Sequence, residues 1–159
     1  MSEHLHTLTT LQDLEEFKAY LIDNKDSVES ICALDTEGTD KEPLKSKCIG
    51  YSISLYQDEG FYIPLFTWTD ERGLCTEAPE LIPKEGCNTE ERLYKCLSPA
   101  AEKVALEILN YMAEWRLIEH NAVYDVIILL KNFDINHRHS VYIDSMLLKH
   151  TISVPGRRS

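Results

Sequence analysis

Two carboxylates one residue apart follow a short apolar run near the start of the chain. Asp35 and Glu37 come directly after residues 31–34, which read Ile-Cys-Ala-Leu. Alternate side chains of a β-strand point to the same face, so both carboxylates would project together from the end of a core strand. Like charges held that close repel, and a divalent cation bound through oxygen ligands would compensate them. The alternative is a strand that runs out into a solvated turn at residues 35–38.

A third carboxylate lies in a segment where burial is expected. Asp125 is embedded in the apolar stretch 122–130, and a carboxylate there is costly unless it is paired or bound to a metal. Asn121 lies four residues earlier, on the same face of a helix. The alternative is that Asp125 occupies the polar edge of an amphipathic helix, or that Asn121 and Asp125 cap the helix near its start.

The hydrophobic pattern predicts the elements that must position these side chains. Helical spacing of apolar residues, with Thr9 or Thr10 as the first cap, predicts helices at residues 9–22, 99–115, 122–132 and 145–152. Alternating or continuous apolar runs predict strands at residues 31–36, 47–56, 61–65, 117–119 and 141–143. The second and third of these strands would form an antiparallel ribbon. The order of elements is typical of a mixed α/β layer fold.

Composition indicates one domain that spans residues 1–159. With 159 residues and 43% hydrophobic content the chain can bury one sizeable core. Residues 67–99 are rich in Pro, Gly, Glu and Thr, which predicts a surface insertion without regular structure. No apolar run approaches the roughly 20 residues of a membrane span, and the first residues lack the pattern of a secretory signal. We therefore expect a cytoplasmic protein that does not enter a membrane.

The net charge of −11 does not favour nucleic-acid binding, because Lys and Arg usually supply the phosphate contacts. It does not exclude binding either, since carboxylates can draw a nucleic acid through the cations they hold. Lys41, Lys45 and Lys47 would then form a local basic patch just after the carboxylate pair. The alternative for these lysines is a solvated loop face.

Several motifs in order resemble the DEDD family of 3′-to-5′ exonucleases, and more narrowly the proofreading exonuclease domain of family A, Pol I-type DNA polymerases. The resemblance begins with Asp35-Thr36-Glu37 and continues with Asn121 and Asp125 spaced four apart. The segments that complete it are residues 34–37, 49–54, 61–65, 120–125, 143–147 and 153–157.

The resemblance implies an RNase H-like (DnaQ-like) mixed sheet flanked by helices. It also implies hydrolysis of the 3′-terminal phosphodiester of single-stranded DNA with two Mg²⁺ or Mn²⁺ ions. By motif position Asp35 would bridge both metals, Glu37 would hold the metal that activates water, and Asp125 would serve the other metal. The residues expected to contact nucleic acid are Thr36, Gly38, Lys41, Asn121 and Tyr124.

The family also carries a third motif, in which a Tyr or His precedes a fourth metal-binding Asp by four residues, and no such motif follows Asp125 here. The resemblance therefore predicts a domain truncated before that motif and its helices. Asp144 matches a family Asp that begins a helix, so we expect it to act as a cap rather than as a ligand.

Three hypotheses remain open. The chain is a proofreading domain whose missing motif and polymerase lie elsewhere, or a non-catalytic module that binds a polymerase or nucleic acid. The third is a stand-alone nuclease whose fourth ligand comes from a partner chain, from Asp144 or from His150. We expect exonuclease chemistry with weak or no turnover by this chain alone.

Overall fold

A mixed six-stranded sheet forms the centre of the computed structural model, which describes residues 4–69, 78–83 and 90–152. In sheet order the strands are β1 (His4–Thr7), β4 (Glu59–Pro64), β3 (Cys48–Ser54), β2 (Ile31–Gly38), β8 (Arg116–Glu119) and β9 (Val141–Asp144). Strands β2, β3 and β4 run antiparallel in turn, whereas β1 pairs in parallel with β4, β8 with β2, and β9 with β8. The predicted mixed α/β layer architecture and the antiparallel ribbon are confirmed.

Side-chain caps begin the first two helices of the described chain. The helices are α1 (Leu11–Asn24), α2 (Pro99–Met112), α3 (Ala122–Phe133) and α4 (Ser145–Ile152). Thr10 caps α1 in a capping box with Asp13, and Ser98 accepts a hydrogen bond from the backbone of the first turn of α2. Among the described residues we find no helix with the length and apolar character that a membrane crossing requires.

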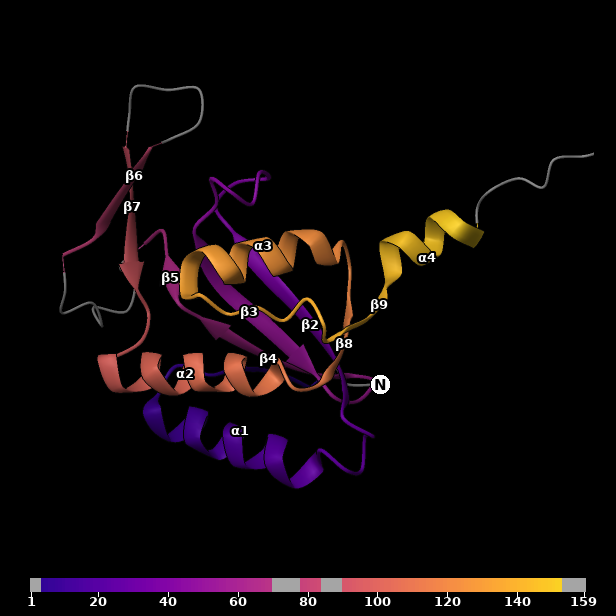
Figure 1. The fold of residues 1–159 in the computed structure, drawn as a ribbon. Helices are drawn as coiled ribbons and strands as arrows, with labels where there is room; N and C mark the ends of the chain where they lie inside the picture. The colour runs from indigo at the N-terminus through magenta and orange to yellow at the C-terminus, as the bar shows by residue number, and fades with distance from the viewer. Residues whose placement is uncertain (1–3, 70–77, 84–89, 153–159) are drawn as a thin grey trace, which may run out of the picture.

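Helices cover one face of the sheet (Figure 1). The Tyr51 hydroxyl of β3 donates a 2.7 Å hydrogen bond to the carbonyl of Ala105 in α2, and α1 packs beside α2. Helix α3 lies over β2 and β3. On β2 the residues toward the helices, Cys32, Leu34 and Thr36, are buried.

The opposite face of β2 is polar and open. Ala33, Asp35 and Glu37 alternate with the buried residues and are exposed. The strict alternation along this strand therefore puts the predicted carboxylate pair on the face that the described helices leave uncovered.

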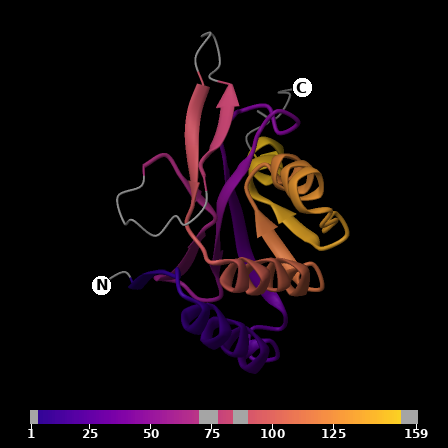
Figure 2. The ribbon, with the colours of Figure 1, turned by 90° about the vertical axis from the view of Figure 1, so that its left-hand side faces the viewer.

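A small sheet occupies part of the predicted insertion. Its strands are β5 (Phe66–Thr67), β7 (Glu90–Lys95) and β6 (Glu80–Pro83), and β6 and β7 extend away from α1 and α2 (Figures 1 and 2). The sequence predicted no regular structure here, because the strands are short and carry many charges. The antiparallel pairing of β6 with β7 and the complete burial of Leu93 supply what the local pattern does not show. Strand β1 was also missed, because all four of its residues are exposed.

Candidate functional site

Asp35 and Glu37 lie on the last part of β2, opposite Ser52 and Gly50 of β3. Both side chains are exposed on the uncovered face, but they border different hollows. Asp35 lines a hollow of about 660 Å³ over the open sheet. Glu37 lines a pocket of about 450 Å³ at the end of the strand, which we call the Glu37 pocket.

Asp125 lies on the helix-covered side of β2 and is 1% exposed. Its Oδ1 accepts hydrogen bonds from the Thr36 backbone N–H (2.9 Å) and from the Thr36 hydroxyl (2.5 Å). Strand β2 makes its last pair with β8 at Ala33, so the carboxylate meets β2 beyond that pairing. Thr36, the residue between the two exposed carboxylates, is therefore the anchor for the third.

The pKa values of these carboxyl groups reflect their crowding. Burial raises the pKa of Asp125 to about 6, although the hydrogen bonds from Thr36 oppose this rise, and the charges of Glu119 and Asp35 add to it. Burial also raises the pKa of Asp35, and the nearby His120 lowers it. Asp125 thus interacts with Asp35 across the strand, and a cation beside them would favour the ionised form of both.

The donor atoms suit a hard divalent cation, since carboxylate oxygens are its preferred ligands. Asp35 and Glu37 fit this role in exposure and in direction. Within the part of the chain that the structure describes, however, no three His, Cys, Asp or Glu side chains form a group able to hold a metal. The hydrogen bonds from Thr36 occupy Oδ1 of Asp125 and fix this carboxylate on the helix-covered side of β2.

The Glu37 pocket brings together all five residues that the sequence predicts to contact nucleic acid. Besides Glu37, its lining residues include Thr36, Gly38, Lys41, Asn121 and Tyr124. They come from β2, from the connection that follows it and from the start of α3. Side chains far apart in the sequence therefore surround one hollow beside the carboxylate pair.

The backbone conformation at position 121 favours Asn, independently of its place in the motif. Its φ is 63°, in the left-handed region that Asn adopts more readily than most residues. Its side chain makes no capping hydrogen bond with α3, although it stands at the N-cap position. The predicted alternative, that the Asn121 side chain caps the helix, is therefore wrong.

Tyr124 ties α3 to the connection between β2 and β3, residues 39–47. Its hydroxyl donates to the carbonyl of Asp40 at 2.7 Å and lies 3.0 Å from the Ser46 hydroxyl. A Cβ on Gly38 would stand 2.1 Å from this Tyr124 oxygen, so only glycine fits there without displacement. Tyr124 and Gly38 thus shape the wall of the Glu37 pocket.

Asp144 caps two helices, as the sequence predicted for one. Its carboxylate accepts hydrogen bonds from the backbone N–H groups of Asn121 and Ala122 at the start of α3, and from Met146 and Leu147 in α4. Partial desolvation raises the pKa of Asp144, but these backbone bonds outweigh it and leave the pKa below its ordinary value. The Asp144 carboxylate therefore acts as a helix cap. The other candidate for the fourth metal ligand, His150, lies outside the described side chains.

Sequence reasoning missed two features near these carboxylates. His120 borders the same hollow as Asp35 and lies 2.9 Å from the Ser145 hydroxyl. Glu119 Oε1 and His137 Nε2 lie 2.7 Å apart in the core, with side chains at most 1% exposed. Their positions in the sequence were the available signal. Glu119 ends β8, which is parallel to β2, and His120 follows it; the carboxyl ends of parallel strands meet at one edge of a sheet.

Comparison with solved structures finds the same fold in two exonuclease domains. The Nibbler EXO domain of Aedes aegypti aligns with a TM-score of 0.52 and 10% identity over 97% of this chain and 58% of that chain. The EXD2 exonuclease domain, soaked in Mn and GMP, aligns with a TM-score of 0.53 and 11% identity over 92% of this chain and 58% of that chain. No protein-family model and no curated protein matches.

The chain spans 58% of the length of each of these two structures. At such low identity the likeness concerns the fold. The six-stranded mixed sheet and its flanking helices have the RNase H-like architecture of these exonuclease domains, as the sequence motifs implied.

Proposed function

We propose that this chain is a 3′-to-5′ exonuclease-type domain that binds the 3′ end of single-stranded DNA and acts on its terminal phosphodiester with divalent cations. One observation carries the proposal. Thr36 separates the exposed carboxylates of Asp35 and Glu37 and itself anchors Asp125. Two of the three predicted carboxylates therefore lie on the same three-residue stretch of β2, and the third is hydrogen-bonded to it. This stretch lies beside the Glu37 pocket.

Asp35 and Glu37 are the residues that would hold Mg²⁺ or Mn²⁺, with Asp125 as the third predicted ligand. A bound divalent cation supplies positive charge to the phosphodiester and lowers the pKa of a water molecule. The side chains around the Glu37 pocket would position the nucleotide. Lys41, Asn121 and Tyr124 border the pocket in which the terminal nucleotide would lie.

Metal binding gives the most direct test. Mn²⁺ is titrated calorimetrically into the wild-type chain, into Asp35→Asn and into Glu37→Gln. Glu15→Gln serves as the matched control, because Glu15 is an exposed carboxylate of α1. We expect Mn²⁺ binding in the wild type and control, and at least tenfold weaker binding in each site variant. No binding to the wild type, or equal binding to all four proteins, would remove the metal site.

Cleavage is tested on a 5′-labelled single-stranded DNA in Mg²⁺ or Mn²⁺. We expect at most slow shortening from the 3′ end, abolished by Asp35→Ala. A rate comparable to complete exonuclease domains, lost in Asp35→Ala, would contradict the prediction of weak turnover. Shortening that persists in Asp35→Ala would contradict the assignment of the site.

The second candidate is a non-catalytic module of exonuclease fold that binds nucleic acid or a polymerase. It is favoured by the lack of a three-ligand metal group among the described residues. DNA binding that is unchanged by chelation, together with no cleavage in any metal, would select this candidate.

Association with a DNA polymerase in proofreading is the finer proposal, and it rests on the sequence motifs alone. A second chain, or a further segment, would supply the missing Tyr or His and the fourth Asp. The test adds a DNA polymerase, or a segment that carries the Tyr or His and the fourth Asp, to the isolated chain. We expect the cleavage rate to rise at least tenfold, and an unchanged rate would contradict the proposal.

A further inference from the structure

A second hollow adjoins the Glu37 pocket on the side of the small sheet. It measures about 610 Å³, and Thr39 and Asp40 line both hollows. Its remaining walls are formed by Lys45, Lys47, Trp68, Ile82, Pro83 and Glu91. We call it the Trp68 groove. It lies between residues 39–47 and the face of β6 and β7 that carries the paired residues Ile82 and Glu91.

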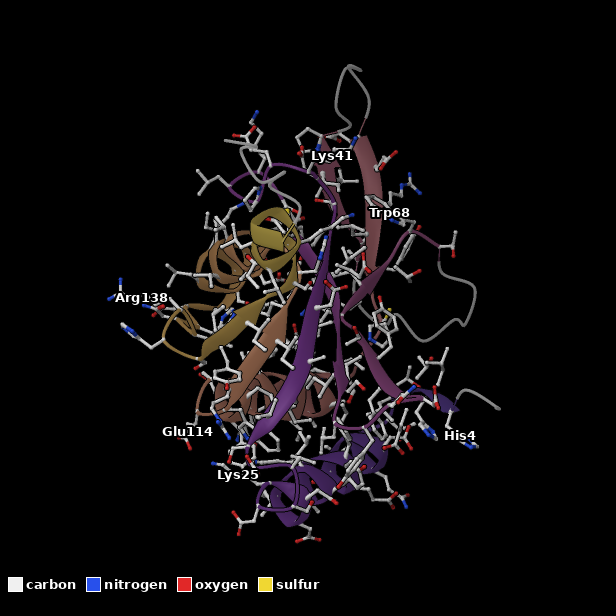
Figure 3. All side chains as sticks on the ribbon, turned by 90° about the vertical axis from the view of Figure 1, so that its right-hand side faces the viewer. His4, Lys25, Lys41, Trp68, Glu114 and Arg138 are labelled. Atoms are coloured by element: carbon white, nitrogen blue, oxygen red, sulfur yellow. The ribbon has the colours of Figure 1, made fainter. Side chains whose placement is uncertain are left out.

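Trp68 gives this groove an aromatic wall. The side chain follows β5 directly and is 40% exposed, so part of the indole is accessible to a ligand. Ile82 and Pro83 add apolar surface from β6. Trp68 and Lys41 lie toward the same end of the molecule, opposite Lys25 and Glu114 (Figure 3).

The charges around the groove are balanced rather than positive. Lys47 is paired with Glu80 at 2.5 Å, and Lys45 with Glu42 at 2.6 Å. The Lys47 ammonium also lies 4.4 Å from the centre of the Phe66 ring. A balanced, aromatic hollow suits the flat face of a nucleobase better than a dense row of phosphates. A duplex conceals those base faces, whereas a single strand presents them.

We propose that the Trp68 groove is a base-binding subsite, in which the Trp68 indole stacks on a nucleotide upstream of the one held in the Glu37 pocket. This inference rests on the proposed function, because continuity through Thr39 and Asp40 is what directs a strand from the pocket into the groove. The small sheet formed by β5, β6 and β7 then serves as a wall for the single strand. Its role is to extend substrate contact beyond the terminal nucleotide.

Tryptophan fluorescence reports on the groove directly. The chain contains two tryptophans, and Trp115 is 1% exposed in the core. In Trp115→Phe the emission therefore comes from Trp68 alone. This variant is titrated with thymidine monophosphate and with oligo(dT) of two to six nucleotides in Ca²⁺, and the oligonucleotides are checked for integrity afterwards. Anisotropy of labelled oligo(dT) gives the affinity of the wild type, Trp68→Ala, Trp68→Phe and the control variant Leu81→Ala.

We expect oligonucleotides to quench Trp68 and the monophosphate to leave it unchanged. Affinity should rise with length, and Trp68→Ala should lose roughly 5- to 150-fold for the longer oligonucleotides, which is the range for one stacked base. Trp68→Phe should retain most of the affinity. Leu81→Ala is the matched control, because Leu81 is 57% exposed on the neighbouring position of β6 and does not line the groove, and its affinity should equal that of the wild type.

The failures of the two proposals are distinguishable. Oligonucleotide binding that weakens in Lys41→Gln and Glu37→Gln, without quenching of Trp68 or loss in Trp68→Ala, would overturn the subsite and leave the proposed function standing. Absence of binding to any nucleotide or oligonucleotide would overturn the proposed function itself. Equal quenching by a duplex of the same length, or quenching by a peptide and not by oligo(dT), would also overturn the subsite.

Discussion

At the scale of single residues, Thr36 connects the two sides of the sheet. Its neighbours Asp35 and Glu37 face the open side, while its own N–H and hydroxyl hold Asp125 on the covered side. The arrangement places a buried carboxylate close to an exposed one, and both have raised pKa values. Such crowding lowers stability at neutral pH, and functional sites are where it commonly occurs.

Asp125→Asn should stabilise the chain at neutral pH. The pKa of Asp125 is raised from 3.8 to about 6, so the folded chain binds this proton more tightly than the unfolded chain. The free energy of unfolding therefore falls as the pH rises through this interval. We expect the variant to be about 1 to 3 kcal/mol more stable than the wild type at pH near 7.5, and nearly equal at pH near 4. Urea unfolding at both pH values measures this.

The Glu15→Gln control should keep the wild-type pH dependence, because this carboxylate is exposed on α1. Equal stability of Asp125→Asn and the wild type at both pH values would contradict the burial of a charged Asp125. Lower stability of the variant near pH 7.5 would contradict it as well.

Gly38→Ala should destabilise the wall of the Glu37 pocket. The added Cβ would lie 2.1 Å from the Tyr124 hydroxyl and 2.2 Å from the Ser46 hydroxyl, so at least one side chain must move. We expect the free energy of unfolding, measured in urea, to fall by about 1 to 3 kcal/mol. The loss should be smaller in a Tyr124→Phe background, where the closest atom is absent.

Gly60→Ala is the control for this substitution. Its Cβ would meet only the end of the Leu5 side chain, at 3.1 Å, and we expect a much smaller loss. Equal losses of stability at both glycines would show that the contacts around Tyr124 do not determine the loss in Gly38→Ala.

At the scale of elements, Asp144 joins the starts of two helices. Helix α3 begins with Asn121 in a left-handed conformation and without a side-chain cap of its own. The carboxylate at the end of β9 supplies the missing acceptor and also caps α4. The start of α3 is thus capped by a residue at the end of a neighbouring parallel strand.

Asp144→Ala should lower the melting temperature by roughly 3 to 8 °C, because backbone N–H groups at two helix starts lose their acceptor. We expect the helical circular dichroism signal to fall as well, while Mn²⁺ affinity stays unchanged. Asp134→Asn, at the left-handed C-terminal end of α3, is the control and should melt like the wild type. A loss of Mn²⁺ affinity in Asp144→Ala would instead support Asp144 as a ligand.

At the scale of the whole molecule, the net charge and the open sheet face limit how the chain can bind a nucleic acid. The chain carries 27 acidic and 16 basic side chains, and the lysines of residues 39–47 include two in ion pairs. Such a surface repels a polyanion except where a cation or a few lysines intervene. Contact with a nucleic acid should therefore be local, short and dependent on divalent cations.

The salt dependence of DNA binding should accordingly be shallow. Each phosphate neutralised on a single strand contributes a slope of about 0.7 to the plot of log Kd against log salt. We expect a total slope of no more than about 2 at constant Mn²⁺, and a fall of about 0.7 in Lys41→Gln. Anisotropy titrations over a range of NaCl concentrations measure it. A steep slope of about 5 or more would indicate a phosphate-binding surface elsewhere on the chain.

Much of the fold follows from local patterns. The alternation along β2 correctly predicted that Asp35 and Glu37 share a face; Asp144 was predicted as a cap, and Thr10 was one of two candidates for the first cap. Strands β1, β6 and β7 were not found, because each gains its stability from pairing partners rather than from its own sequence.

The sequence by itself determined the residue types that can do chemistry here and their order along the chain. Only the tertiary structure decided which of them meet. It placed five predicted contact residues around the Glu37 pocket, and it anchored Asp125 at Thr36, on the helix-covered side of the strand that carries Asp35 and Glu37. The physical reason is that strand alternation is a local property, whereas the face a helical side chain reaches depends on how α3 packs against β2.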